Sequence, residues 1–207
     1  MDTDSSIRNF IKPFKQQKFG FSVEDATQIK WTKLVESLVV LSIEKGDPVE
    51  ISLSLVVIEG CALNESLCGA NRENIINRLW EHVAKHDQRL GSQILRTTRL
   101  VSPQSVEANF SELDRCLGAA HPLLRLEALI ASTPVCERHL QKILLLQYDD
   151  YFSEVNIAGR MEFIIRNEAF AILSSRFGAV EKIELSETVG NEIVYFWDWN
   201  PLLAIVP

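Results

Sequence analysis

The chain has 207 residues, a formal net charge of -7, 46% hydrophobic residues and 24% charged residues. This composition excludes a disordered, collagen-like or coiled-coil chain, and the length suits one domain with a sizeable core. The acidic balance argues against nucleic acid as a partner, because affinity for phosphates comes mainly from Lys and Arg. No apolar run is long enough to span a bilayer and the first residues are acidic, so we expect a cytoplasmic protein without a transmembrane segment.

The first twenty residues predict an amphipathic arm. Over residues 5–18, apolar side chains recur at helical spacing with cations around them, and Pro13 is expected to kink or split the helix. We expect this arm, residues 1–20, to dock on a single helical domain formed by residues 21–207, or else to bind a partner or a membrane surface. The apolar residues are Ile7, Phe10, Ile11 and Phe14, and the cations are Arg8, Lys12, Lys15 and Lys18.

The next segment predicts a helix over about residues 23–45. Ser22 and Asp25 resemble a capping box at its start, and Gly46 supplies a stop. Asp47 and Pro48 then offer an N-cap and a first-turn proline for a second helix. Alternating apolar residues after Pro48 also fit a strand, so residues 36–60 are either two helices or a β-hairpin.

Cleaner helical signals follow. Asn71 can cap a helix, Ser102-Pro103 opens one that Gly118 closes, and His121-Pro122 and Thr133-Pro134 open two more. A long helix is expected from Ser153 to Gly178, and a β-hairpin from about residue 180 to residue 199. The predicted fold class is mainly α, a compact array of antiparallel helices with a C-terminal β-hairpin.

Two helix starts resemble each other. The segments 46–55 and 120–129 align so that Pro48 matches Pro122, 74 residues or two periods of 37 later. The second segment, with Arg125 and Ala128 after its proline, resembles the start of a HEAT-type repeat. The resemblance covers about residues 46–175 and implies a curved helical stack with a binding face, without any chemistry.

Residues that carry chemistry are sparse. His82 and His86 have the i, i+4 spacing of a zinc pair, but the general base and a third ligand are missing. Cys136 and His139 could pair as nucleophile and base, although a thiol in an apolar helix is usually inert. The glycines match neither of the two phosphate-binding loop patterns, GxGxxG and the Walker-type loop that ends in Gly-Lys-Ser or Gly-Lys-Thr. We predict no catalytic, cofactor-binding or metal-binding residues and no cofactor, and we interpret the four cysteines as small buried hydrophobes.

Two segments are candidate protein-binding sites. Carboxylates and phenols gather at an expected junction between helices, where the alternative is a solvated turn. A dense aromatic segment near the C-terminus should place one strand face in the core and leave its end exposed. Tyrosine and tryptophan anchor many protein interfaces. The candidate residues are Tyr148, Asp149, Asp150, Tyr151 and Glu154 in the first segment, and Asp198 and Trp199 in the second.

These observations favour a non-enzymatic module that binds a protein which the sequence does not identify, for example an inhibitor or an immunity-type protein whose acidic charge speeds association with a basic target. Two alternatives stay open. One is a viral or phage assembly protein that self-associates as a homo-oligomer through its arm and its apolar tail. The other is an enzyme of unfamiliar type that uses His82, His86 or the carboxylates at Asp149 and Asp150.

Overall fold

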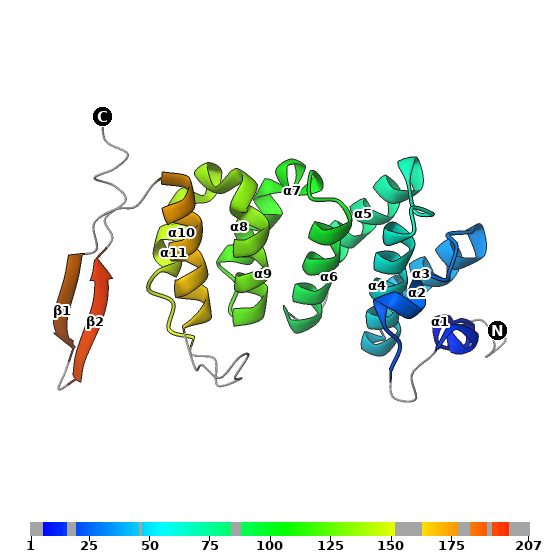
Figure 1. The fold of residues 1–207 in the computed structure, drawn as a ribbon, viewed down its shortest axis with the longest axis horizontal. Helices are drawn as coiled ribbons and strands as arrows, with labels where there is room; N and C mark the ends of the chain where they lie inside the picture. Colours follow the sequence, from blue (N-terminus) through cyan, green and yellow to red (C-terminus); the bar gives the residue numbers. More distant parts are fainter. Residues whose placement is uncertain are drawn as a thin grey trace. The chain divides into compact units, whose positions relative to one another are not determined.

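The computed structural model describes residues 6–15, 20–45, 47–83, 88–151 and 163–177, and the backbone of two strands at 183–189 and 192–198. It is mainly helical, as predicted (Figure 1). Contacts divide the chain into two compact units, residues 1–132 and 133–207. The predicted division into an arm, residues 1–20, and one domain, residues 21–207, stays a prediction.

Three long helices of the first unit contact one another in chain order: α4 packs on α6, and α6 on α9 (Figure 1). Each also packs on the long helix that precedes it, so the pairs are α3 with α4, α5 with α6, and α8 with α9. The bounds in this unit are α1 Ile7–Phe10, η1 Lys12–Phe14, α2 Val23–Ala26, α3 Lys33–Lys45, α4 Pro48–Leu63, α5 Gly69–Val83, α6 Gln88–Val101, α7 Ser105–Ala108, α8 Phe110–Leu117 and α9 Pro122–Ser132.

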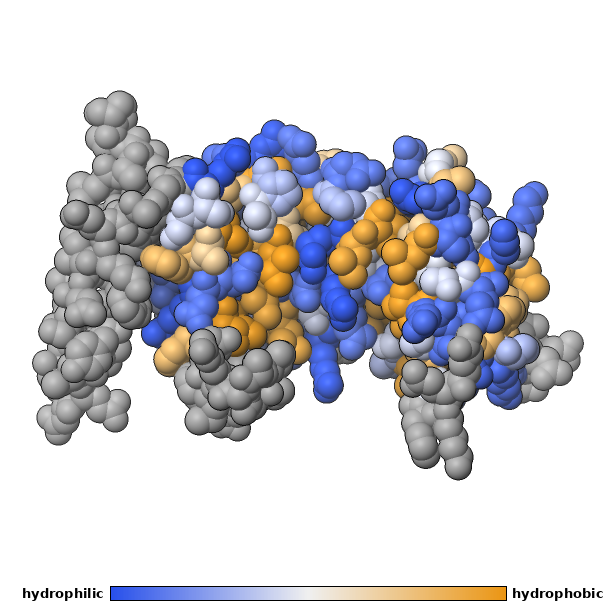
Figure 2. Space-filling model, viewed as in Figure 1, coloured by the Kyte–Doolittle hydropathy of each residue, from blue (hydrophilic) through white to orange (hydrophobic). Residues whose placement is uncertain are grey.

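The core of the first unit lies between these helices. Its fully buried aliphatic side chains include Val39, Ile58, Leu79, Ile94 and Leu129, one from each of α3, α4, α5, α6 and α9. Figure 2 shows hydrophobic surface over α4 and a hydrophilic band over α6 on the visible face of this unit. Each helix therefore buries an apolar stripe against its neighbours while α6 keeps polar residues toward solvent.

The N-terminal segment is split, as Pro13 predicts. Helix α1 ends at Phe10, and the three-residue turn η1 contains the proline. Helix α1 contacts both α3 and α4, with Ile7 fully buried and Ile11 nearly so. Ile7 and Ile11 of this segment are thus buried within the first unit, whereas Phe10 and Phe14 are half-buried.

The single helix predicted over residues 23–45 is wrong, because the chain leaves the helical path between α2 and α3. The side-chain amide of Asn64 donates to the carbonyls of Thr27 and Ile29, both at 2.7 Å. The backbone N–H of Trp31 donates to the Ser66 hydroxyl at 2.9 Å. These bonds satisfy backbone groups that a continuous helix would satisfy internally. Residues at and just beyond the end of α4 therefore hold the break open.

Close packing of α2 on α4 requires a glycine at position 60. A Cβ atom at Gly60 would lie 2.4 Å from the Cβ of Ala26 and 2.6 Å from its carbonyl carbon. Such distances are far inside van der Waals contact, so the two helices approach as closely as they do only because this residue lacks a side chain.

Residues 36–60 form two helices, and the alternative hairpin is wrong. The Asp47 carboxylate accepts hydrogen bonds from the backbone N–H groups of Val49 at 2.9 Å and Glu50 at 3.4 Å. Pro48 occupies the first helical position, where a missing N–H costs nothing. Ile51, Leu55 and Ile58 then share the buried face at helical spacing. The alternation of apolar residues after Pro48 therefore does not reflect a strand.

Other predicted boundaries need small corrections. Helix α5 begins at Gly69, two residues before the predicted cap Asn71. The helix predicted from Ser102 to Gly118 is two helices, α7 and α8, with Asn109 at the break, where its side-chain amide donates to the Ser105 carbonyl at 2.9 Å. Helix α9 begins at Pro122, as predicted.

The second unit begins with η2 (Thr133–His139), which runs into α10 (Leu140–Leu146), and α10 packs on α11 (Ile164–Phe177). Ile143, Ile165, Ala169 and Leu173 are buried in this unit. Strands β1 (Ile183–Val189) and β2 (Glu192–Asp198) pair antiparallel. Residues 152–162, where the predicted helix from Ser153 begins, lie outside the described residues.

Candidate protein-binding surface

The segment Tyr148 to Tyr151 forms a turn after α10. The backbone N–H groups of Tyr148 and Asp149 donate to carbonyls three residues earlier, at 3.0 and 3.2 Å, which tightens the end of the helix. The Asp149 carboxylate then accepts from the N–H of Tyr151 at 3.0 Å. This is an Asx turn, so one carboxylate of the predicted site supports the backbone locally.

An arginine from α11 connects this turn to an aromatic ring. The Nε of Arg166 donates to the backbone carbonyl of Asp149. Its guanidinium carbon lies 4.1 Å from the ring centroid of Phe163, a cation–π distance. Arg166 therefore links the start of α11 to the turn that follows α10.

Apolar and aromatic side chains on this surface are exposed. Leu145 is 70% exposed, Tyr148 53% and Phe163 36%, and Asp150 is exposed as well. Leu145 and Tyr148 are three residues apart, so they lie on the same side of the chain as it leaves α10. We call the following set of residues the acidic aromatic cluster: Leu145, Tyr148, Asp149, Asp150, Tyr151, Phe163 and Arg166.

The structure brings together four of the residues predicted from the sequence, Tyr148 to Tyr151. Glu154 and Trp199 lie outside the described residues, as does the side chain of Asp198, so their part in a site stays a prediction.

Sequence reasoning missed Leu145, Phe163 and Arg166. Residues 143–146 form an uninterrupted apolar run, and nothing in it distinguishes the exposed Leu145 from the buried Ile143 and Leu146. The contact of Arg166 with the turn spans 17 residues of sequence. Only the fold therefore shows which members of the run face solvent and which arginine joins them.

Cys136 is the candidate nucleophile, and its surroundings bear on that role. Cys136 is fully buried, and burial, followed by the nearby charge of Glu137, raises the pKa of its thiol. A thiol with a raised pKa is protonated at neutral pH and is a poor nucleophile. No group of three His, Cys, Asp or Glu residues in the described part of the chain could hold a metal ion, and His86 lies outside that part.

The cysteines follow the predicted pattern with one exception. Cys61, Cys116 and Cys136 are buried and all four thiols are free, but Cys68 is exposed just before the start of α5. Burial raises the pKa of the Cys116 thiol to about 11. The three buried thiols therefore act as small apolar groups in the core.

In comparisons with known proteins, no family model, no curated protein and no solved structure matches the chain. Across the residues that the structure describes, no helix combines the length and the apolar character that crossing a membrane requires.

Proposed function

We propose that this chain is a non-enzymatic protein-binding module and that the acidic aromatic cluster is part of its binding surface. The observation that carries the proposal is the exposure of Leu145 and Tyr148 beside the Phe163–Arg166 stack. Aromatic residues and arginine dominate the energetics of protein interfaces, and exposed apolar side chains gain most when a partner covers them. Asp150 adds an exposed negative charge at the rim.

The proposed architecture is a HEAT-like helical stack with a C-terminal hairpin at residues 180–199. Its support in the first unit is the order of contacts, in which α4, α6 and α9 follow one another and each has a partner helix. Pro48 and Pro122, which carry the sequence resemblance, both stand at the first position of such a helix. Stacked helix pairs commonly present an extended binding face.

The net charge of -7 favours a partner with a basic surface, because opposite charges speed the encounter of two proteins. An inhibitor or immunity-type protein that neutralises a basic enzyme fits this description. In such a complex, Tyr148 and Leu145 would enter a pocket of the partner while Asp150 faces a Lys or Arg at the edge.

The experiment compares two variants in cells that naturally express the protein. Tagged wild-type chain should co-purify one foreign protein in stoichiometric amount, and the double variant Leu145→Ser with Tyr148→Ala should lose it. We expect affinity to fall by about 30-fold or more, the usual loss for interface anchors. The matched control is Leu63→Ser in α4, because Leu63 is also 70% exposed but lies outside the cluster.

A partner retained equally by both variants would contradict the proposed surface. Recovery of only more of the same chain, in assemblies that light scattering detects at rising concentration, would replace the binding-module proposal with the self-associating assembly protein. A stoichiometric metal ion in the purified protein would favour the enzyme alternative.

A further inference from the structure

A groove of about 340 Å³ opens on the first unit between the N-terminal segment and α4. Its apolar lining comes from Ile11 on one side, Phe21 after α1 and η1, and Val49 and Leu53 on α4. Val49 is 54% exposed although it is aliphatic. Val49 and Leu53 are one helical turn apart, so they present two neighbouring apolar contacts along one wall.

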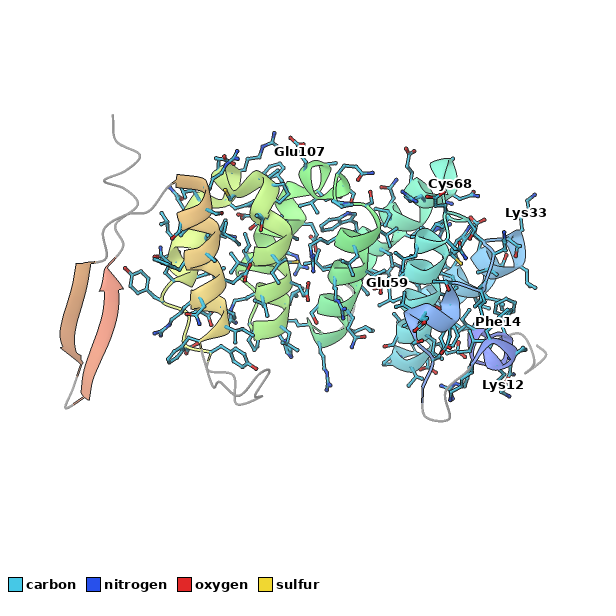
Figure 3. All side chains as sticks on the ribbon, viewed as in Figure 1. Lys12, Phe14, Lys33, Glu59, Cys68 and Glu107 are labelled. Atoms are coloured by element: carbon cyan, nitrogen blue, oxygen red, sulfur yellow. The ribbon has the colours of Figure 1, made fainter. Side chains whose placement is uncertain are left out.

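Three cations surround this apolar lining. Arg8, Lys12 and Lys15 line the groove, all three are exposed, and none of the described lining residues is acidic. Arg8 also lies 3.8 Å from the Asp47 carboxylate, but both side chains are about half exposed, so that ion pair is weak and can be exchanged. Figure 3 labels Lys12 on η1. The three cations outnumber the one carboxylate beside them, Asp47, so the groove is locally positive on a chain of net charge -7 and suits an anionic ligand.

We propose that the groove binds an acidic amphipathic helix of a partner protein. Two apolar side chains at i and i+4 would contact Val49, Leu53 and Phe21, and carboxylates beside them would face the three cations. A single small anion such as a fatty acid would neutralise only one cation, whereas a helix with several carboxylates can match all three. The site lies in a different unit from the acidic aromatic cluster and selects the opposite charge, so it does not rest on the proposed function.

Gly20 offers a way to fill the groove without disturbing the fold. It lines the groove, and a Cβ atom added to it would meet no heavy atom within 4 Å. Because Gly20 lines the groove, we expect an indole introduced by Gly20→Trp to compete with the ligand.

The test is a selection of helical peptides from a random display library against the full chain, followed by fluorescence anisotropy with the selected peptides. We expect enriched peptides to carry Asp or Glu together with apolar residues at i and i+4. Their affinity should fall by about 10-fold or more in Gly20→Trp and in Lys12→Glu with Lys15→Glu, and should weaken with added salt. Lys33→Glu, which changes an exposed cation of α3 outside the groove, should bind as the wild type does.

Enriched peptides without carboxylates, or peptides whose affinity is unchanged by both Gly20→Trp and the charge reversal, would overturn the proposal. Binding to phosphatidylserine vesicles without binding to any acidic peptide would overturn it in favour of a membrane surface. The double variant Leu145→Ser with Tyr148→Ala should keep full peptide affinity, so a failure of the acidic aromatic cluster and a failure of the groove give different results.

Discussion

Two irregular segments of this chain, one in each unit, differ in which residues form hydrogen bonds with their backbone groups. Between α2 and α3, the Asn64 amide donates to the carbonyls of Thr27 and Ile29, and the Ser66 hydroxyl accepts from the backbone N–H of Trp31. Ile29 is buried. After α10, the turn at Tyr148 to Tyr151 is supported by its own Asp149 and by Arg166, and Tyr148 is exposed.

The segment between α2 and α3 is a structural break, whereas the turn after α10 belongs to a candidate binding surface. A segment that buries Ile29 and Trp31 must have its backbone groups satisfied by residues elsewhere, and changing those residues should cost stability. The exposed apolar and aromatic side chains of a surface turn add little to the core, so changing them should cost binding more than stability. Substitutions in the two segments and in the helices around them can test that division.

The largest effect is expected at Gly60, where α2 meets α4. Gly60→Ala places a methyl group 2.4 Å from the Cβ of Ala26, and the helices must separate to admit it. We expect the free energy of unfolding to fall by about 3 kcal/mol, as for a badly overpacked core site. Urea unfolding followed by circular dichroism measures this. Gly20→Ala is the control, because its methyl group meets no neighbour, and an equal loss in both variants would contradict the packing account.

Next in size is the loss of the Asn64 amide. Asn64→Ala removes both hydrogen bonds to the carbonyls of Thr27 and Ile29, and should lower the free energy of unfolding by about 2 kcal/mol. The matched control is Asn74→Ala, whose exposed side chain makes a long contact of 3.5 Å with Glu36. If the two asparagine variants unfold at the same urea concentration, the break between α2 and α3 is not held by Asn64.

A smaller effect is expected at the N-cap of α4. Asp47→Ala leaves the N–H groups of Val49 and Glu50 without their acceptor, at a cost of about 1 kcal/mol in the free energy of unfolding. Asp47→Asn should restore most of the stability, because asparagine is an equally good cap. Thermal unfolding of the three proteins decides this, and a failure of asparagine to rescue would indicate that charge rather than capping matters here.

The smallest stability effect is expected in the acidic aromatic cluster itself. Tyr148→Ala should change the free energy of unfolding by less than about 0.5 kcal/mol, since a half-exposed ring contributes little to the core. Urea unfolding of this variant beside Asn64→Ala tests the comparison directly. A loss from Tyr148→Ala as large as that from Asn64→Ala would mean that the ring is structural.

Local signals in the sequence predict some helix starts. Asp47-Pro48 and Pro122 act through groups a few residues away, so the sequence alone places the start of α9 and offers α4 as one of two alternatives. The break between α2 and α3 could not be predicted, because the side chain that satisfies it, Asn64, lies 37 and 35 residues away from its two acceptors. Capping motifs inform only about neighbours in sequence.

The candidate site shows the same limit. Tyr148 to Tyr151 stand out by composition, and they are exposed or half-buried in the turn where a junction was predicted. The contribution of α11 was missed, since neither Phe163 nor Arg166 resembles a binding motif until the fold places them beside the turn. The sequence shows the three cations of the groove beside the apolar residues of the N-terminal segment. It does not show that Val49 and Leu53 of α4 form the facing apolar wall.

The most direct measurement is photo-crosslinking from position 148 in cells that naturally express the protein. A benzoylphenylalanine replaces Tyr148 in one variant and Leu63 in the control, both exposed in the free chain. The binding-module account predicts that the first variant forms one covalent adduct with a foreign protein on irradiation and that the control does not. An adduct only with a second copy of this chain, or the same foreign adduct from both positions, would contradict it.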